Sequence, residues 1–284
     1  MRIGFIGIGL MGLPLCRRLH AAGIDLTVWN RSPAKCTALA GLGIAVADSP
    51  AALAARVDVV LLCIADTAAV EQVSLGAQGI AAGARPGLLV VDHSSIAPAA
   101  TRDIAARLQQ ACGAHWVDAP VSGGVGGAES GSLVIMAGGR EEDVERVRPL
   151  LMHYARRLTR MGGVGAGQVT KVCNQLVVAA NSLLIAETVA LAEHAGVDAR
   201  LLAPALAGGF ADSLPFQILA PRMAERRFEP VQWKVQTLLK DLGNALALAD
   251  ETGSTVPLAR SASALMRSHA DAGHAAADLS SIIA

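Results

Sequence analysis

The chain has 284 residues, of which 52% are hydrophobic and 17% charged, and its 24 basic and 24 acidic side chains leave a formal net charge of zero. This balance predicts a folded globular protein and excludes a disordered one, and without a basic stripe we expect no nucleic-acid partner. The five cysteines are scattered without a CxxC pair, so we expect no disulfide framework, no metal site and a reducing, cytoplasmic location.

In the first half of the chain, short apolar runs alternate with stretches of helical character. The apolar runs, which we predict as strands, cover residues 3–7, 26–29, 57–64, 88–92, 116–118 and 132–137. The helices expected among them cover residues 13–22, 33–40, 101–111 and 141–153. The run at 57–64 is apolar without alternation, which is typical of a strand covered on both faces. This order predicts an N-terminal α/β domain of Rossmann type, with a doubly wound parallel sheet.

The glycine-rich stretch at residues 162–167 is the best candidate for a domain boundary. We therefore predict a first domain over residues 1–163 and a second over residues 164–284. Helical periodicity in the second domain covers residues 169–195, 201–206, 214–227, 235–252 and 258–272. The second domain is thus expected to be all-α, with Gly196 as the C-cap of its long first helix.

The composition of the second domain also bears on its partners. The long apolar helix and the abundance of Ala and Leu predict exposed hydrophobic surface, so we expect a homodimer or homotetramer. No membrane partner is expected, because no apolar run reaches the ~20 residues of a membrane helix. The nearest run, residues 176–186, is interrupted by Asn181 and Ser182.

The motif GxGxxG lies directly after the first predicted strand and directly before the first helix. It comprises Gly7, Gly9 and Gly12, with Leu10 and Met11 between the last two. The first glycine allows a tight turn, the second lets a pyrophosphate approach the backbone, and the third lets the helix pack closely on the strand. The helix N-terminus would add unpaired N–H groups for the anion. An ordinary glycine-rich turn is the alternative, but the flanking elements favour a dinucleotide site.

The end of the second strand indicates which dinucleotide is bound. NAD sites usually carry Asp or Glu there, to bind the ribose 2′-hydroxyl, but this chain has Asn30, Arg31 and Ser32, with Lys35 soon after. Arg31 can bind a 2′-phosphate through charge-assisted hydrogen bonds. We therefore predict NADP(H) as the preferred cofactor. NAD(H) stays possible, because Asn30 could still bind a hydroxyl and Arg31 could be an ordinary surface arginine.

Three later segments, together with GxGxxG, carry a family resemblance. They are DAPVSGG at residues 118–124, GAGQVTKVCNQ at residues 165–175, and the pair Lys240-Asp241. In order and spacing the four segments resemble the β-hydroxyacid dehydrogenase family over essentially the whole chain. The resemblance implies hydride exchange between NAD(P) and a small 3-hydroxy acid substrate.

The lysine of the second segment, Lys171, is the candidate catalytic residue. Lys171, Asn174 and Gln175 share one helix face. A lysine in an apolar helix carries a desolvation cost unless it has a task or a partner. By resemblance, Lys171 is the general acid that protonates the carbonyl oxygen during reduction and the base in the reverse direction. A surface lysine whose amine reaches solvent is the alternative.

Candidate substrate-binding residues lie in the same two segments. The Ser122 hydroxyl and the exposed backbone of Gly123 and Gly124 could bind a carboxylate, although a plain β-turn would also favour the two glycines. By resemblance, Asn174 and Gln175 hold the oxygen atoms of the substrate. Many relatives have Asn at both positions, so the role of Gln175 is open.

Four further residues receive roles from the resemblance. It places Lys240 near the cofactor and Asp241 near the active site, although a surface charge pair would be worth little energy. It places Trp233 in the substrate pocket, where a plain core tryptophan is the alternative. Ser95 follows a strand at the carboxyl edge of the sheet and is expected near the nicotinamide, whereas the nearby His93 is expected to be incidental.

The choice of substrate rests on a closer resemblance. Asn174-Gln175, GGFA at residues 208–211 and DLS at residues 278–280 resemble the tartronate semialdehyde reductase branch, which forms glycerate. We therefore expect an NADPH-dependent reductase of tartronate semialdehyde. The alternatives are a 3-hydroxyisobutyrate dehydrogenase, a broad succinic semialdehyde or glyoxylate reductase, and a non-catalytic NADPH sensor or scaffold.

Overall fold

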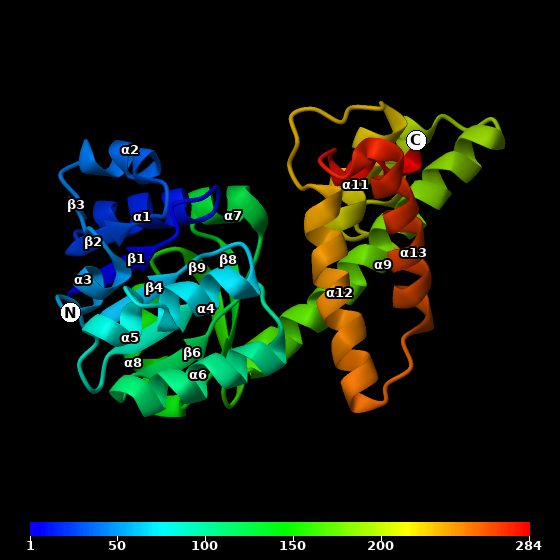
Figure 1. Cartoon of the computed structure of the whole chain (residues 1–284). Coiled ribbons are helices and arrows are strands. Elements are labelled where there is room, and N and C mark those ends of the chain that lie inside the picture. The colour runs from blue at the N-terminus through cyan, green and yellow to red at the C-terminus, as the bar shows by residue number, and fades with distance from the viewer. The chain divides into compact units, whose positions relative to one another are not determined.

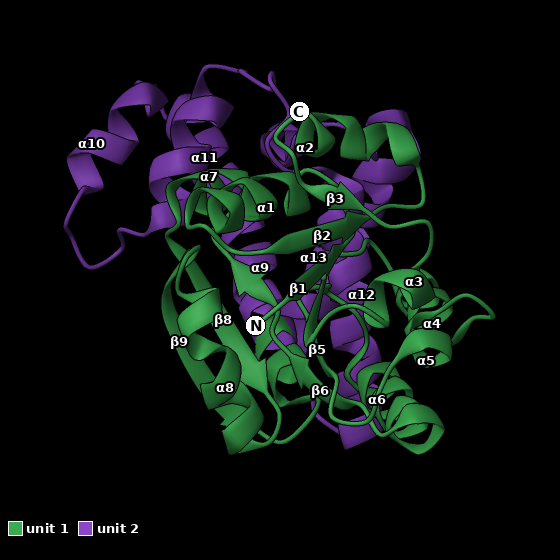
Figure 2. Ribbon diagram, turned by 90° about the vertical axis from the view of Figure 1, so that its left-hand side faces the viewer, with its two compact units in different colours: residues 1–171 green, residues 172–284 purple.

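The computed structural model describes residues 1–284. They form two compact units, residues 1–171 (unit 1) and residues 172–284 (unit 2), coloured separately in Figure 2.

Unit 1 is built on one nine-stranded sheet. The strands, in order across the sheet, are β3 (Ala45–Val46), β2 (Leu26–Trp29), β1 (Ile3–Ile6), β4 (Val59–Leu62), β5 (Leu89–Asp92), β6 (His115–Asp118), β8 (Leu133–Gly138) and β7 (Val121–Ser122), and β9 (Ala155–Gly162) also pairs with β8. From β3 to β6 all neighbours are parallel. The order runs outward from β1 in both directions, which confirms the predicted doubly wound sheet.

Helices cover both faces of this sheet. One face packs against α1 (Gly12–Ala21), α2 (Thr37–Ala40), α7 (Gly124–Ser130) and α8 (Glu141–Leu151). The other packs against α3 (Pro50–Ala54), α4 (Thr67–Leu75), α5 (Ile80–Gly83) and α6 (Pro98–Cys112). Neighbouring strand residues alternate between the two cores, so Phe5 and Leu61 lie in the first, and Ile6 and Leu62 in the second. In Figure 1, α1 and α2 lie above the strands, and α5 and α6 below them.

The sheet departs from a purely parallel one at its far edge. Strand β8 is antiparallel to β6 and β7 and parallel to β9. Strand β9 was not predicted, because three exposed arginines (Arg156, Arg157 and Arg160) and a register shift hide the strand alternation. An edge strand can carry such charges at little cost. The elements β3, β7, α3, α5 and α7, of two to seven residues, were also missed, and so was the nine-residue α4, which buries only Val70 and Ser74.

Unit 2 is helical, as predicted. Its helices are α9 (Ala166–His194), whose first residues belong to unit 1, α10 (Leu202–Leu206), α11 (Leu214–Ala224), α12 (Val235–Thr252) and α13 (Pro257–His269). One core joins the C-terminal half of α9 to α10 and α11, and a second joins the middle of α9 to α12 and α13. Gly196 has φ +80° and follows the end of α9, and the N–H of Val197 donates to Ala192 O at 2.9 Å. The predicted C-cap is therefore confirmed.

The length and hydropathy of helix α9 differ from the expectation that no segment is long and apolar enough to cross a membrane. It is long and apolar enough to cross a membrane, with a mean hydropathy of 1.6 over 18 residues, of which 33% are buried. A single such helix is weak evidence, because core helices of soluble proteins meet the same criterion. The exposed side chains Val177, Leu184 and Leu191 recur every seven residues, so they form one stripe along the helix.

Candidate active site

The glycine loop between β1 and α1 has three glycines with different packing. Gly7 has φ +105°, and a Cβ there would overlap the carbonyl of Cys63. A Cβ on Gly12 would overlap the carbonyl of Gly7, so this glycine allows the helix to approach the strand. A Cβ on Gly9 would meet no atom within 4 Å. The fold therefore requires Gly7 and Gly12, whereas packing does not require glycine at position 9.

The end of β2 is tied to this loop by Asn30. The Ile8 N–H donates to Asn30 Oδ1 at 2.9 Å, and Asn30 Nδ2 donates to the Ser32 carbonyl at 3.0 Å. Arg31 and Ser32 are exposed. An open backbone approach beside a helix N-terminus, next to an exposed arginine and without a carboxylate, fits a phosphate-bearing dinucleotide.

The carboxyl end of β5 holds a buried aspartate that the sequence analysis did not single out. Asp92 Oδ1 accepts the Ser94 N–H at 2.9 Å, Oδ2 has no hydrogen-bond partner, and burial raises the pKa of Asp92 to about 7. The Ser94 hydroxyl accepts the Ile64 N–H at 2.9 Å and so links the ends of β4 and β5. Ser95 follows directly and is half-buried.

His93 has a structural part in this arrangement. Its Nδ1 lies 2.6 Å from Ala119 O and its Nε2 lies 2.8 Å from the Tyr154 hydroxyl. A carbonyl only accepts, so Nδ1 carries the proton and Tyr154 donates to Nε2. Burial lowers the pKa of His93 to about 4, which agrees with a neutral core histidine.

Lys171 lies beside the DAPVSGG segment. Its side chain is 9% exposed, and its Nζ donates to Val121 O at 2.9 Å. This carbonyl precedes the half-buried Ser122 and the exposed Gly123 and Gly124. Gly124 begins α7 and is not part of a plain turn. Unit 1 thus brings the predicted acid and the predicted carboxylate-binding segment together, and Lys171 is not a surface lysine.

Asp118, which opens that segment, caps the helix that carries Lys171. The N–H of Gly165 donates to Asp118 Oδ1 at 2.7 Å, and the N–H of Gln168 donates to Oδ2 at 2.9 Å. Burial raises the pKa of Asp118 to about 6, although these N–H groups act in the opposite direction. This role of Asp118 was not predicted from the sequence, because its partners lie 47 and 50 residues away.

A second cluster lies within unit 2. Asn174 Nδ2 donates to Gln175 Oε1 at 2.8 Å, and Gln175 Nε2 donates to Asp241 Oδ2 at 2.5 Å. Lys240 Nζ lies 3.1 Å from Asp241 Oδ1. Asp241 is 5% exposed and the Lys240 side chain 36% exposed, so Lys240-Asp241 is a half-buried charge pair and not a fully exposed one. Both ends of the Gln175 amide are occupied, and this side chain orients Asn174.

Trp233 precedes α12 in a loop that a buried ion pair holds in place. Trp233 is half-buried against the core of α12 and α13. The N–H groups of Gln232 and Trp233 donate to Asp278 Oδ2 at 2.7 and 3.3 Å. Asp278 in turn lies 3.3 Å from the buried Arg222. The resemblance at residues 278–280 did not predict these contacts of Asp278.

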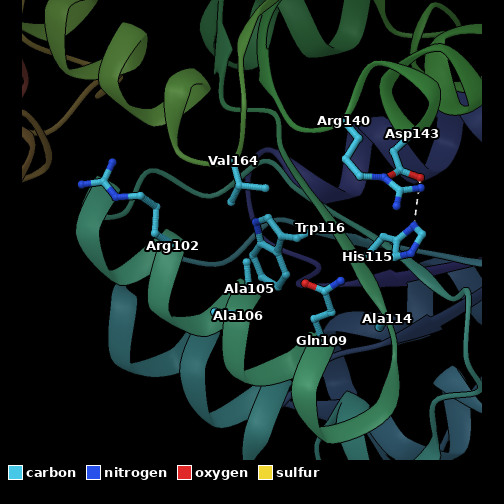
Figure 3. A pocket seen from close by; sticks show the side chains of 10 residues that line it. All are labelled: Arg102, Ala105, Ala106, Gln109, Ala114, His115, Trp116, Arg140, Asp143 and Val164. Atoms are coloured by element: carbon cyan, nitrogen blue, oxygen red, sulfur yellow. Dashed lines mark hydrogen bonds and ion pairs between the residues drawn. The ribbon is translucent and has the colours of Figure 1, made fainter.

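A pocket of ≈ 340 Å³ elsewhere on unit 1 contains none of these residues. Figure 3 shows it with Trp116 at its centre and with the His115–Asp143 contact at one side. It is lined by residues of α6, the start of β6, Val164, and Arg140 with Asp143. It therefore lies apart from the predicted catalytic, substrate-binding and cofactor-binding residues.

Comparisons with known proteins agree with this arrangement. Residues 2–163 match the NAD binding domain of 6-phosphogluconate dehydrogenase, and residues 165–284 match the NAD-binding domain of NADP-dependent 3-hydroxyisobutyrate dehydrogenase. The chain is 35% identical over 283 residues to 2-hydroxy-3-oxopropionate reductase of Escherichia coli, covering 100% of this chain and 96% of the relative.

Solved structures of similar proteins also match this chain over its whole length. The 3-hydroxyisobutyrate dehydrogenase of Mycobacterium tuberculosis, solved with L-serine, has a TM-score of 0.90 and 32% identity, over 100% of this chain and 98% of that one. A structure of Psf3 in complex with NADP+ and 2-OPP has a TM-score of 0.89 and 28% identity, over 99% and 98% of the two chains. As its motifs predicted, the chain belongs to the β-hydroxyacid dehydrogenase family of NAD(P)-dependent oxidoreductases.

Proposed function

We propose that this enzyme is an NADPH-dependent reductase that converts tartronate semialdehyde to glycerate. The observation that carries the proposal is the buried Lys171, whose Nζ is held 2.9 Å from Val121 O, next to Ser122. The similarity to the Escherichia coli 2-hydroxy-3-oxopropionate reductase over the whole chain supports the same reaction.

In this proposal the chain binds the substrate and supplies its proton. When bound, the reduced nicotinamide supplies a hydride to the carbonyl carbon. Lys171 holds a proton at Nζ and donates it to the carbonyl oxygen, which becomes the hydroxyl, and it takes the proton back in the reverse direction. Ser122, Gly123 and Gly124 bind the carboxylate through a hydroxyl and backbone N–H groups. Asn174, oriented by Gln175, binds a substrate oxygen, and Asp241 completes this hydrogen-bonded chain.

Other site residues act in binding. The Trp233 side chain lines the substrate pocket in this proposal, and Ser95 and Lys240 bind near the nicotinamide. Gly7, Gly9, Leu10, Met11 and Gly12 form the pyrophosphate loop. The loop geometry at Gly9 supports this role, because backbone there is open to a ligand.

We also propose NADPH over NADH as the cofactor. Asn30 already binds Ile8 and Ser32 within the loop, which leaves the exposed Arg31 and Ser32 for the ribose substituent. Replacing Arg31 by Ala is expected to weaken NADPH binding about 10-fold or more and to change NADH binding little. Titration by nicotinamide fluorescence measures both dissociation constants, and Arg56→Ala, an exposed arginine elsewhere on unit 1, is the control. Equal losses for both cofactors would contradict the assignment.

The second candidate is 3-hydroxyisobutyrate dehydrogenase activity, favoured by the structural match to the Mycobacterium tuberculosis enzyme. Tartronate and methylmalonate semialdehydes differ by a hydroxyl against a methyl group. A pocket that hydrogen-bonds the hydroxyl rejects the methyl analogue strongly, whereas an apolar pocket discriminates poorly.

The test is NADPH oxidation with four aldehydes: tartronate, methylmalonate and succinic semialdehydes, and glyoxylate. We expect the highest kcat/KM with tartronate semialdehyde, and loss of turnover in Lys171→Ala with NADPH binding retained. A preference for methylmalonate semialdehyde would favour the second candidate and leave the mechanism intact. Tight NADPH binding without turnover of any aldehyde would indicate a sensor or scaffold.

We propose finally that the chain is a homodimer or homotetramer. The exposed stripe of Val177, Leu184 and Leu191 on α9 supports this, because such surface is usually covered in solution. Light scattering at micromolar concentration tests it, and a monomer would contradict it.

A further inference from the structure

The first turn of α9 is capped by a residue from the sheet. The first N–H groups of a helix lack partners within the helix and usually bind a side chain just before it. Residues 162–165, before α9, are Gly, Gly, Val and Gly, and none of them can do this. Instead, the carboxylate of Asp118, at the end of β6, caps the helix by accepting the N–H groups of Gly165 and Gln168 at 2.7 and 2.9 Å.

Close packing makes this cap possible. A Cβ on Gly167 would overlap the carbonyl of Met136 and lie 2.8 Å from Asp118 Oδ2. A Cβ on Gly138 would lie 2.6 Å from Asp118 Oδ1. The helix end is thus in contact with the strand ends themselves, and a carboxylate at a helix N-terminus is stabilised by the helix dipole.

Gln168 adds a second tie, to the neighbouring strand. Its side chain is 1% exposed, its Nε2 donates to Ser94 O at 2.7 Å, and its Oε1 accepts the Ile96 N–H at 3.4 Å. These two partners flank Ser95. Lys171 follows Gln168 by one turn of the same helix, and its Nζ reaches Val121 O.

We propose that Asp118 and Gln168 are positioning residues for the reaction. They tie the first turn of α9 to the ends of β5 and β6, and this fixes where the Lys171 amine lies relative to Ser95 and Ser122. A local cap would stabilise the helix but would leave its position on the sheet free. The proposal rests on the acid role of Lys171 proposed above.

The test compares Gln168→Met, which keeps the side-chain length but removes both hydrogen bonds, with Asp118→Asn, which keeps one acceptor oxygen. The control is Ser49→Ala, because Ser49 caps α3 locally through the Ala52 N–H at 3.0 Å. We expect kcat to fall 10-fold or more in Gln168→Met and in Asp118→Asn, with the NADPH dissociation constant within threefold of that of the parent. The control should keep its kcat.

A readout without catalysis accompanies the kinetics. Hydrogen exchange of the amides at residues 165–171 should become at least 10-fold faster in both variants and stay unchanged in Ser49→Ala. Unchanged kcat despite faster exchange would overturn the positioning role while Lys171→Ala remains inactive. Full turnover in Lys171→Ala would instead overturn both this inference and the proposed mechanism. If Asp118→Asn does not fold, Gln168→Met decides alone.

Discussion

The two units hold their site segments in different ways. In unit 1, the Asp118 carboxylate accepts backbone N–H groups at 2.7 and 2.9 Å, and burial raises its pKa to about 6. In unit 2, the Asp278 carboxylate accepts backbone N–H groups as well, but side chains are added to them: Arg222 lies 3.3 Å away and the Ser280 hydroxyl donates at 2.6 Å. Burial of Asp278 would raise its pKa, but this hydroxyl and the neighbouring N–H groups outweigh burial and lower it.

Because the two aspartates have different partners, the two site segments depend on different residues. The tie in unit 1 depends on the Asp118 carboxylate and on the close approach of backbone that Gly138 and Gly167 allow. The buried ion pair in unit 2 depends on both of its partners, because the loss of one leaves the other charge buried alone. The two units should therefore respond to different kinds of substitution.

The largest effect is expected from breaking the buried pair of unit 2. Replacing Arg222 by Met leaves Asp278 buried, at 2% exposed, without its cation. We expect the free energy of unfolding to fall by ~3–5 kcal/mol, measured by urea denaturation. Arg200→Met breaks the exposed pair with Asp198 and should cost under ~1 kcal/mol. Equal losses of unfolding free energy in the two variants would show that the buried pair contributes no more to stability than the exposed one.

The second effect is the pH dependence of the free energy of unfolding, which has opposite signs for Asp92 in unit 1 and Asp278 in unit 2. Unfolded Asp92 ionises near 3.8, whereas the folded pKa is about 7, so this residue contributes stability below pH 4 that is lost as pH rises through 7. The loss is at most about 4 kcal/mol. Asp278 has a lowered pKa, so its contribution is present above pH 4 and is lost as pH falls further.

Melting temperatures between pH 3 and 8 test these opposite signs. Asp92→Asn should flatten the fall in stability between pH 4 and 7, and Asp278→Asn should flatten the fall at acid pH. If Asp92→Asn instead shows the same slope as the parent between pH 4 and 7, the carboxyl does not titrate as its burial implies.

A smaller effect is expected in the glycine loop, where we expect Gly12 to be needed for stability and Gly9 for NADPH binding. Gly12→Ala places a Cβ on the Gly7 carbonyl and should cost ~1–3 kcal/mol. Gly9→Ala has open space and should leave stability within ~0.5 kcal/mol. Its NADPH dissociation constant should nevertheless rise about 10-fold, because the backbone must approach the pyrophosphate. Unaltered NADPH binding by Gly9→Ala would place the cofactor elsewhere.

The sequence predicted much of the fold because periodicity and glycine spacing are local signals. A window of a few residues is enough to predict the strands β1, β4 and β5 and the long helix α9. The ties that fix the site are not local: Asp118 reaches Gly165, and Asp278 reaches Gln232, across dozens of residues. Nothing at either end of such a contact distinguishes it in sequence, so Asp118, Gln168 and Arg222 were missed as site supports, although Asp118 and Gln168 lay inside recognised motifs.

The smallest effect concerns Gln175, where the family resemblance led us to expect Asn. Its amide links Asn174 to Asp241, at 2.8 and 2.5 Å, so Gln175→Asn shortens the link by one methylene. We expect a loss of ~1 kcal/mol in stability from the broken hydrogen bond. Because Asn174 loses its orienting partner, KM for the aldehyde should rise several-fold, with kcat within threefold.

The control for this link is Gln217→Asn, since Gln217 makes a comparable hydrogen bond to Asp212 at 2.6 Å elsewhere in unit 2. Steady-state kinetics with both variants separates the two effects. A rise in KM confined to Gln175→Asn shows that unit 2 positions a substrate-binding amide through Gln175, as unit 1 positions Lys171 through Asp118 and Gln168. Equal KM values in both variants would reduce Gln175 to a packing role, and the comparison between the units would then hold for stability alone.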